Sequence, residues 1–161
     1  MTNSDGKSSD RWPDLAGRID NGRHVLPVRV YHEDTDFTGL VYHANFLKFI
    51  ERARSDMVRL AGISQTDLFS GEGDKEPAAF VVRHIDIDYL KPAHMNDLLE
   101  IVTRVEEVGG AVMTLLQEVK RAETVVVRAR VKIVLVAQSG KVMRMSALVR
   151  AGLERFINEE D

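Results

Sequence analysis

The spacing of apolar residues changes after residue 77. Between residues 44 and 61 they recur every three or four positions, at Phe46, Phe49, Ile50, Ala53, Met57 and Leu60. This spacing lines one stripe of an α-helix, while Lys48, Arg52 and Arg59 occupy the opposite face. Gly62 follows, and glycine commonly ends a helix at that place. The sequence therefore predicts one long amphipathic helix over residues 44–61.

Beyond residue 77 apolar and polar positions alternate, which is the period of a strand with one buried face. The apolar series are Ile85, Ile87 and Tyr89, then Leu99, Ile101, Thr103 and Val105. Two further strands are expected over about 111–121 and 124–136, the latter dense in β-branched residues. The links between strands are short, and Gly109-Gly110 supplies one turn. Consecutive strands are therefore expected as antiparallel neighbours, and the fold class as α+β.

The N-terminal part predicts a tail and a hairpin. Residues 1–10 are polar and are expected to form a loose tail. Asn21-Gly22, between two short apolar runs, is typical of a tight hairpin turn. Pro27 favours a sheet edge or a bend, because proline donates no ladder hydrogen bond. We expect an N-terminal tail with the start of a hairpin over 1–23, and a single domain over 24–157.

Two other segments carry weaker patterns. Residues 64–77 contain Gly71, Gly73 and Asp74 and predict a mobile loop. Residues 146–157 fit a short helix capped by Ser146, while residues 141–145 fit an extension of the sheet equally well.

Composition narrows the classes of function. The chain has 161 residues, 44% hydrophobic and 29% charged, as expected for one packed domain. Its net charge of -3 argues against nucleic-acid binding. Because there is no cysteine, a disulfide, a thiolate zinc site and a cysteine nucleophile are excluded. No signal peptide or transmembrane segment is apparent, so a cytoplasmic location is expected. No metal site is predicted.

The stretch with most chemistry lies at residues 28–45, where a strand leads through a polar turn into the long helix. The turn carries Asp34, Asp36 and Gly39. A helix start stabilises developing negative charge, and a carboxylate held opposite could attack a substrate or activate water. Gly39 would let the backbone approach a ligand closely. The aspartates also fit turn and cap positions without further function, and His43 alone fits an ordinary surface histidine.

A longer set of motifs carries a resemblance. The run YHEDTDFTGLVYHANF (residues 31–46) is followed by ERAR (51–54), FVVR (80–83), DYLKPA (88–93) and DLLEI (97–101). Together they resemble the hotdog-fold 4-hydroxybenzoyl-CoA thioesterase family, most closely its Tol-Pal-associated acyl-CoA thioesterase branch. The similarity covers about residues 28–136. It implies the hotdog fold, in which an antiparallel β-sheet wraps a long central helix.

The resemblance assigns roles to individual residues. Asp36 matches the catalytic carboxylate, which acts as nucleophile or as base for water. His43 matches the helix start, where its backbone N–H would polarise the thioester carbonyl, although a cap at Asn45 would put His43 before the first turn. Asp34 is expected to orient the turn. Substrate contacts are expected at Gly39, Val41, Tyr42, Glu51 and Lys91, with Glu51 fitting an ion pair with Arg52 or Arg54 equally well.

The resemblance implies an acyl-CoA thioesterase that releases CoA and a free acid, with acyl groups ranging from short-chain to aromatic or longer. No cofactor is implied, because CoA is part of the substrate. Partners implied are further copies of the chain, as a dimer or a homotetramer built as a dimer of dimers, with the site across the pair. Acyl carrier protein or phospholipid-synthesis enzymes are further implied partners.

Three readings remain open at this stage. The chain could be a non-catalytic acyl-thioester-binding hotdog module. The run from Asp34 to Thr38 also fits a haloacid-dehalogenase-type phosphatase using Asp34 and Asp36, although consecutive strands after residue 77 argue against that fold. Finally, Arg128, Arg130 and Lys132 share one strand face, which is typical either of a CoA phosphate site or of a solvated surface.

Overall fold

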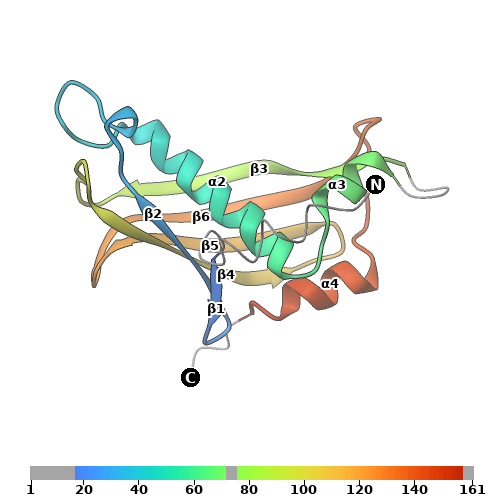
Figure 1. Ribbon diagram of the computed structural model, residues 1–161. Helices are drawn as coiled ribbons and strands as arrows, with labels where there is room; N and C mark the ends of the chain where they lie inside the picture. Colours follow the sequence, from blue (N-terminus) through green and yellow to red (C-terminus); the bar gives the residue numbers. More distant parts are fainter. Residues whose placement is uncertain (1–16, 72–75, 158–161) are drawn as a thin grey trace, which may run out of the picture.

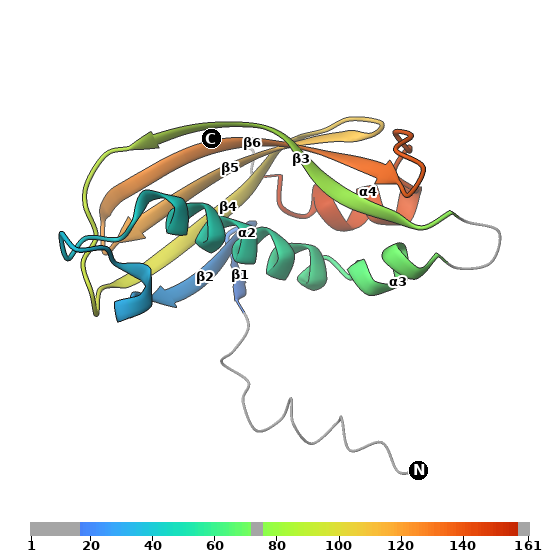
Figure 2. The same ribbon diagram turned by 90° about the horizontal axis from the view of Figure 1, so that it is seen from above.

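In the computed structural model, which describes residues 17–71 and 76–157, one sheet curves around a long helix (Figures 1 and 2). The strands are β1 (Arg18–Asp20), β2 (Arg23–Arg29), β3 (Ala78–Tyr89), β4 (Leu98–Val108), β5 (Val112–Arg121) and β6 (Thr124–Ala137). The helices are α2 (His43–Leu60), α3 (Gln65–Ser70) and α4 (Ala147–Glu154), with a 3₁₀ turn, η2 (His32–Asp34). The predicted α+β class is confirmed.

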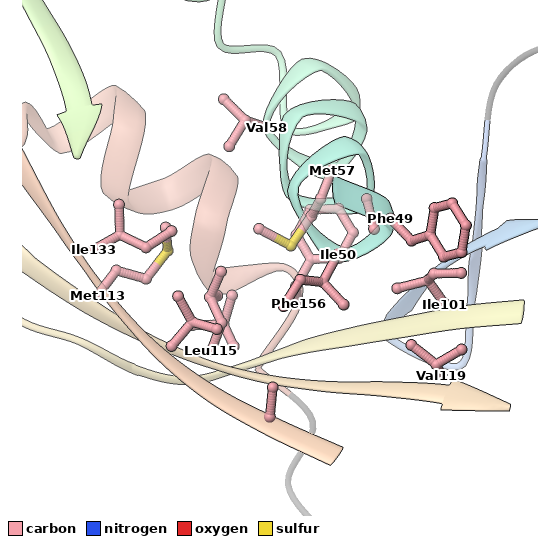
Figure 3. Close-up of a cluster of buried hydrophobic side chains, with 14 of the residues drawn as sticks. Phe49, Ile50, Met57, Val58, Ile101, Met113, Leu115, Val119, Ile133 and Phe156 are labelled. Carbon is pink, nitrogen blue, oxygen red and sulfur yellow. The ribbon is translucent and has the colours of Figure 1, made fainter. Parts of the chain in front are cut away.

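Helix α2 forms the centre of the core. Its apolar stripe, including Phe49, Ile50 and Met57, is buried against β4 and β5 (Figure 3). Burial of a side chain of this size contributes about 1.5–3 kcal/mol relative to exposure. The helix stops where Gly62 takes a φ of +82°. The predicted amphipathic helix is thus confirmed, with its start one residue earlier than expected.

The strand order differs from the predicted meander. The sheet runs β1-β2-β4-β5-β6-β3, so β4, β5 and β6 form a meander but β3 does not pair with β4. Instead β3 lies at the edge beside β6, and β2 takes the place next to β4. The expectation that β3 and β4 are neighbours is wrong, because the link between them carries the chain across the sheet.

All strand pairs are antiparallel. A haloacid-dehalogenase-type phosphatase needs a parallel sheet with alternating helices, so that reading is excluded. The edge position of β3 also explains why its predicted buried face is only partly covered: Ile85 and Ile87 are half-buried, and Tyr89 is 44% exposed.

The N-terminal hairpin is confirmed. Asn21 and Gly22 have φ values of 48° and 70°, as a tight turn between β1 and β2 requires. Strand β1 pairs only with the first part of β2, so Pro27 lies on a stretch whose outer side has no strand partner among the described residues. The predicted tail falls within the first 16 residues, outside the described part of the chain.

Residues 64–77 were predicted as a mobile loop, and this is wrong for their first half. The Ser64 side chain accepts a hydrogen bond of 3.2 Å from the Asp67 N–H and caps α3. Residues 72–75 lie outside the described residues. Near the C-terminus the helical alternative is confirmed: Ser146 caps α4, while residues 141–145 contribute only an isolated bridge between Val136 and Val142.

No helix in residues 17–71 and 76–157 combines the length and apolar character needed to cross a bilayer.

Candidate active site

The turn between β2 and α2 is held together largely by Asp34. Its carboxylate accepts a hydrogen bond of 2.8 Å from the Tyr31 N–H. Its carbonyl oxygen accepts two more, from the Tyr42 N–H at 2.9 Å and from Asn45 Nδ2 at 2.8 Å. Because Asp34 is bonded to Tyr31 on one side and to the start of α2 at two points on the other, the geometry suits an orienting residue.

Asp36 lies at the exposed tip of the same turn. Its Oδ1 accepts hydrogen bonds from the Thr38 N–H at 2.8 Å and from Thr38 Oγ1 at 2.5 Å. These bonds, with the Thr38 hydroxyl contributing most, lower the pKa of Asp36 below its usual value, and His43 adds a smaller effect. The carboxylate is therefore ionised and oriented, and its Oδ2 has no hydrogen bond within the described part of the chain.

The backbone around Asp36 is a tight turn. The Asp36 N–H donates to the Leu40 carbonyl and the Gly39 N–H donates to the Asp36 carbonyl, both at 3.0 Å. Gly39 has a φ of +80°, a conformation that favours glycine, and an added Cβ would meet nothing within 4 Å. Open space at Gly39 leaves room for a ligand beside Asp36.

Helix α2 begins at His43, directly after this turn. Its cap residue, Tyr42, makes no side-chain hydrogen bond to the helix. Asn45 is not the cap, because it is already the third residue of α2, and its side-chain amide donates to the Asp34 carbonyl. His43 is therefore the first helical residue, where backbone N–H groups have no partner within the helix and the dipole favours negative charge.

An aromatic group surrounds the helix start. The His43 ring lies 4.5 Å from the Tyr42 ring and 5.9 Å from the Tyr89 ring, both edge-on. The Tyr89 hydroxyl donates a 3.3 Å hydrogen bond to the His43 carbonyl, and partial burial raises the pKa of Tyr89. Sequence reasoning placed Tyr89 on the buried face of a strand and within the DYLKPA motif, and assigned it no role in the site. Its place at the end of an alternating series and inside that motif was the available signal of a role near α2.

The other predicted substrate residues divide. Tyr42 is 46% exposed beside His43, as a ligand contact requires. The Val41 side chain is 7% exposed and belongs to the core cluster, so a direct contact with substrate is not supported. Lys91 is exposed in the link after β3, where its N–H donates to the Val126 carbonyl.

Glu51 forms an ion pair with Arg54. Arg54 is buried and also donates a 3.0 Å hydrogen bond to the Gln117 side chain, which in turn donates to Thr103. Because its carboxylate balances a buried guanidinium, the geometry favours the ion-pair reading of Glu51 over a substrate contact.

The basic face of β6 is partly neutralised. Arg128 donates to Glu118 at 3.1 and 3.2 Å, and Arg130 donates to Glu106 at 2.8 Å. These contacts favour a solvated, charge-paired surface over a phosphate site. Among the described residues no group of three or more His, Asp or Glu side chains could hold a metal ion.

Comparisons with known proteins identify the family of the chain. Residues 38–132 match the family model described as "Thioesterase superfamily". The chain is 42% identical over 115 residues to "Acyl-CoA thioesterase YbgC" of Haemophilus influenzae, covering 71% of this chain and 81% of that protein. It is 43% identical over 97 residues to "Acyl-CoA thioester hydrolase YbgC" of Escherichia coli O157:H7, covering 60% and 69%.

Solved structures lead to the same fold. A probable thioesterase from Bartonella henselae superposes with a TM-score of 0.74 at 41% identity, covering 77% of this chain and 99% of that one. A 1,4-dihydroxy-2-naphthoyl-CoA thioesterase from Synechocystis gives a TM-score of 0.72 at 23% identity, covering 81% and 95%, which supports the fold alone.

Proposed function

The chain belongs to the thioesterase superfamily, and from this premise we propose that it hydrolyses acyl-CoA to a free acid and CoA with Asp36 as the catalytic carboxylate. The observation that carries the proposal is the carboxylate of Asp36, which Thr38 orients at the turn leading into α2. The known thioesterases that match the chain supply the substrate class.

The reaction can follow two routes from one geometry. Asp36 either attacks the thioester carbonyl or removes a proton from the water that attacks it, and both need the ionised carboxylate. The carbonyl oxygen becomes negative in the tetrahedral intermediate. Backbone N–H groups at His43 and the following residue stabilise it, a role worth about 2.7–4 kcal/mol per donor in other enzymes. The thiolate of CoA then leaves and takes up a proton. On the water route this step gives the free acid directly, whereas on the nucleophilic route water then hydrolyses the mixed anhydride formed on Asp36.

The proposal includes a second copy of the chain. The outer side of β3 has no strand partner in the described part of the chain, and Val81 and Val82 on this edge are 47% and 39% exposed. Phe37, next to Asp36, is 99% exposed. Pairing along the sheet edge would cover these side chains and enclose the acyl group. A sedimentation mass of one chain at working concentrations contradicts this part, whereas two or four chains are expected.

Three further assignments remain predictions: the single domain over residues 24–157, the cytoplasmic location, and acyl carrier protein or phospholipid-synthesis enzymes as partners. Lys91 remains a candidate contact for the CoA phosphates because its side chain is exposed.

The decisive experiment measures CoA release from a panel of short-chain, long-chain and aromatic acyl-CoAs. The wild-type protein should release CoA from at least one of them. Asp36→Asn should lower kcat by about 10²–10⁴-fold, because it removes the base or nucleophile while preserving shape. Substrate binding, measured by calorimetry, should persist.

Asp34→Asn is the matched control, because the same chemical change falls two residues away on a carboxylate bonded to the Tyr31 N–H. It should cost stability and retain most of kcat. Near-normal turnover by Asp36→Asn overturns the role of Asp36. If the wild-type protein releases CoA from none of the substrates, the proposed enzymatic activity is overturned and a non-catalytic acyl-thioester-binding module is favoured.

A further inference from the structure

A cavity of about 870 Å³ lies at the other end of α2, between the residues that follow that helix, α3 and α4. Figure 2 shows α3 and α4 at the end of the molecule opposite the turn that carries Asp36. Ligand sites for small molecules commonly measure about 300–1,000 Å³, so this cavity has the volume of a binding site. It contains neither Asp36 nor His43.

The walls of the cavity are largely apolar. Ile63 and Leu68 line one side, Leu135 and Met143 the sheet side, and Val149 the α4 side. Leu148 of α4 also lines it and is 81% exposed. A single exposed leucine is ordinary, but a leucine at the rim of an apolar cavity indicates a surface that gains stability when covered.

Two arginines, Arg144 and Arg155, line the same cavity. Both are exposed, and neither forms an ion pair with another residue of the described chain. This contrasts with Arg128 and Arg130 on the sheet face, which both contact glutamates.

Two acids also belong to the lining, Asp67 and Glu76. The Glu76 carboxylate accepts a 3.1 Å hydrogen bond from the Ser139 N–H. The two arginines therefore remain the cations available to an anionic ligand at this cavity.

We propose that this cavity binds a medium-chain carboxylate, with its alkyl chain against the apolar walls and its head group at Arg144 and Arg155. Guanidinium groups pair with carboxylates through two parallel hydrogen bonds, and burial of the alkyl chain adds a hydrophobic contribution. The choice of a carboxylate rests on the proposed function, because thioester hydrolysis releases one. The cavity and its unpaired arginines do not depend on it.

Calorimetry with the full-length chain tests the proposal, using decanoate and, as an uncharged analogue, 1-decanol. Decanoate should bind once per chain, and about tenfold more tightly than the alcohol, as expected for about 1.4 kcal/mol from the charged head group. The double variant Arg144→Gln, Arg155→Gln should weaken decanoate binding about tenfold and leave the affinity for the alcohol unchanged. Arg18→Gln, on exposed β1, is the matched control and should change nothing.

A second variant tests the cavity itself. Ala151 is exposed and lines the cavity, so Ala151→Trp should fill the space and abolish binding of both probes. If thermal unfolding shows that this variant does not fold, Leu148→Glu takes its place, since that side chain is 81% exposed and a carboxylate at the rim of the cavity should repel decanoate. Three outcomes overturn the proposal. They are decanoate binding that persists in the folded cavity variant at residue 151 or 148, equal affinity of the wild-type protein for decanoate and decanol, and no decanoate binding to the wild-type protein. None of these outcomes depends on CoA release, so a failure here is distinct from a failure of the proposed function.

Discussion

The two ends of α2 are built in opposite ways. At the C-terminal end the Gly62 N–H donates to the Arg59 carbonyl at 3.0 Å and the Ile63 N–H to the Val58 carbonyl at 3.2 Å, so backbone groups close the helix. At the N-terminal end Tyr42 makes no side-chain cap, and the Asn45 amide is used on Asp34. At its C-terminal end, backbone hydrogen bonds satisfy the last carbonyl groups of the helix. At its N-terminal end, next to the turn that carries Asp36, the first N–H groups have no side-chain cap.

A pair of glycines offers the largest test of this difference. Gly39 and Gly62 have nearly equal φ values, +80° and +82°, and an added Cβ at either would meet nothing within 4 Å. An alanine at either position should therefore carry the same conformational free-energy penalty, about 1–2 kcal/mol for holding an L residue in the left-handed backbone conformation. If the ends differ as described, Gly62→Ala lowers the free energy of unfolding and retains kcat. Gly39→Ala should instead lower kcat, by about 5–30-fold if that cost falls on the active conformation.

Urea unfolding and CoA-release kinetics on both variants separate these outcomes. Equal losses of kcat in the two variants would show that the turn at Asp36 is no more sensitive than the helix stop. The contrast between the ends would then be without functional meaning.

Tyr89 sharpens the comparison at the N-terminal end. Its hydroxyl donates to the His43 carbonyl, and its ring packs on His43 and Phe46. Tyr89→Phe keeps the ring and removes a hydrogen bond worth about 0.5–1.5 kcal/mol. We expect kcat to fall about 2–10-fold with KM unchanged, because the first turn of α2 is held less firmly. Tyr31→Phe is the control, because no hydrogen bond joins the Tyr31 hydroxyl to α2 among the described residues. An unaltered kcat for Tyr89→Phe contradicts the positioning role.

The smallest effect at neutral pH is expected from Thr38→Val. The Thr38 hydroxyl is the largest cause of the lowered pKa of Asp36, and the Thr38 backbone N–H is the second. Asp36 acts when ionised, so activity is lost as the pH falls through its pKa. Without the hydroxyl the pKa rises toward its usual value, and the acid limb of the kcat/KM profile should move to higher pH.

Thr35→Val is the control for that shift, because the Thr35 hydroxyl donates to the His32 carbonyl and does not touch Asp36. At neutral pH both variants should be close to wild type. A pH profile identical for Thr38→Val and the wild-type protein would sink the proposed link between Thr38 and the ionisation of Asp36.

The regular elements followed from local pattern. Phe49, Ile50 and Met57 show the helical period, and Leu99 and Ile101 show the strand period, because one buried face demands it. Helix α3 was missed because its few residues give no period, although Ser64 capping the Asp67 N–H was a readable signal. The sequence pattern could not predict that β2, and not β3, pairs with β4, since strand pairing depends on contacts between segments far apart in the chain.

The candidate site divides along the same line. Sequence patterns and resemblance together proposed Asp36, His43 and Tyr42 as site residues, because a polar turn and a helix start are encoded within one short stretch of chain. Val41 was assigned to the ligand on the same basis, yet its side chain lies in the core. The direction of a side chain in a turn depends on tertiary packing, and the spacing of residue types along the sequence does not predict it.

The sequence by itself determined the long helix, the period of each long strand, the hairpin at Asn21 and the position of the acidic turn, because each depends on residues near one another in the chain. Only the tertiary structure decided that β3 occupies an edge, that Tyr89 reaches His43, and that α3 and α4 line a cavity far from Asp36. Those features join segments distant in sequence, and their free energy comes from packing that no local pattern records.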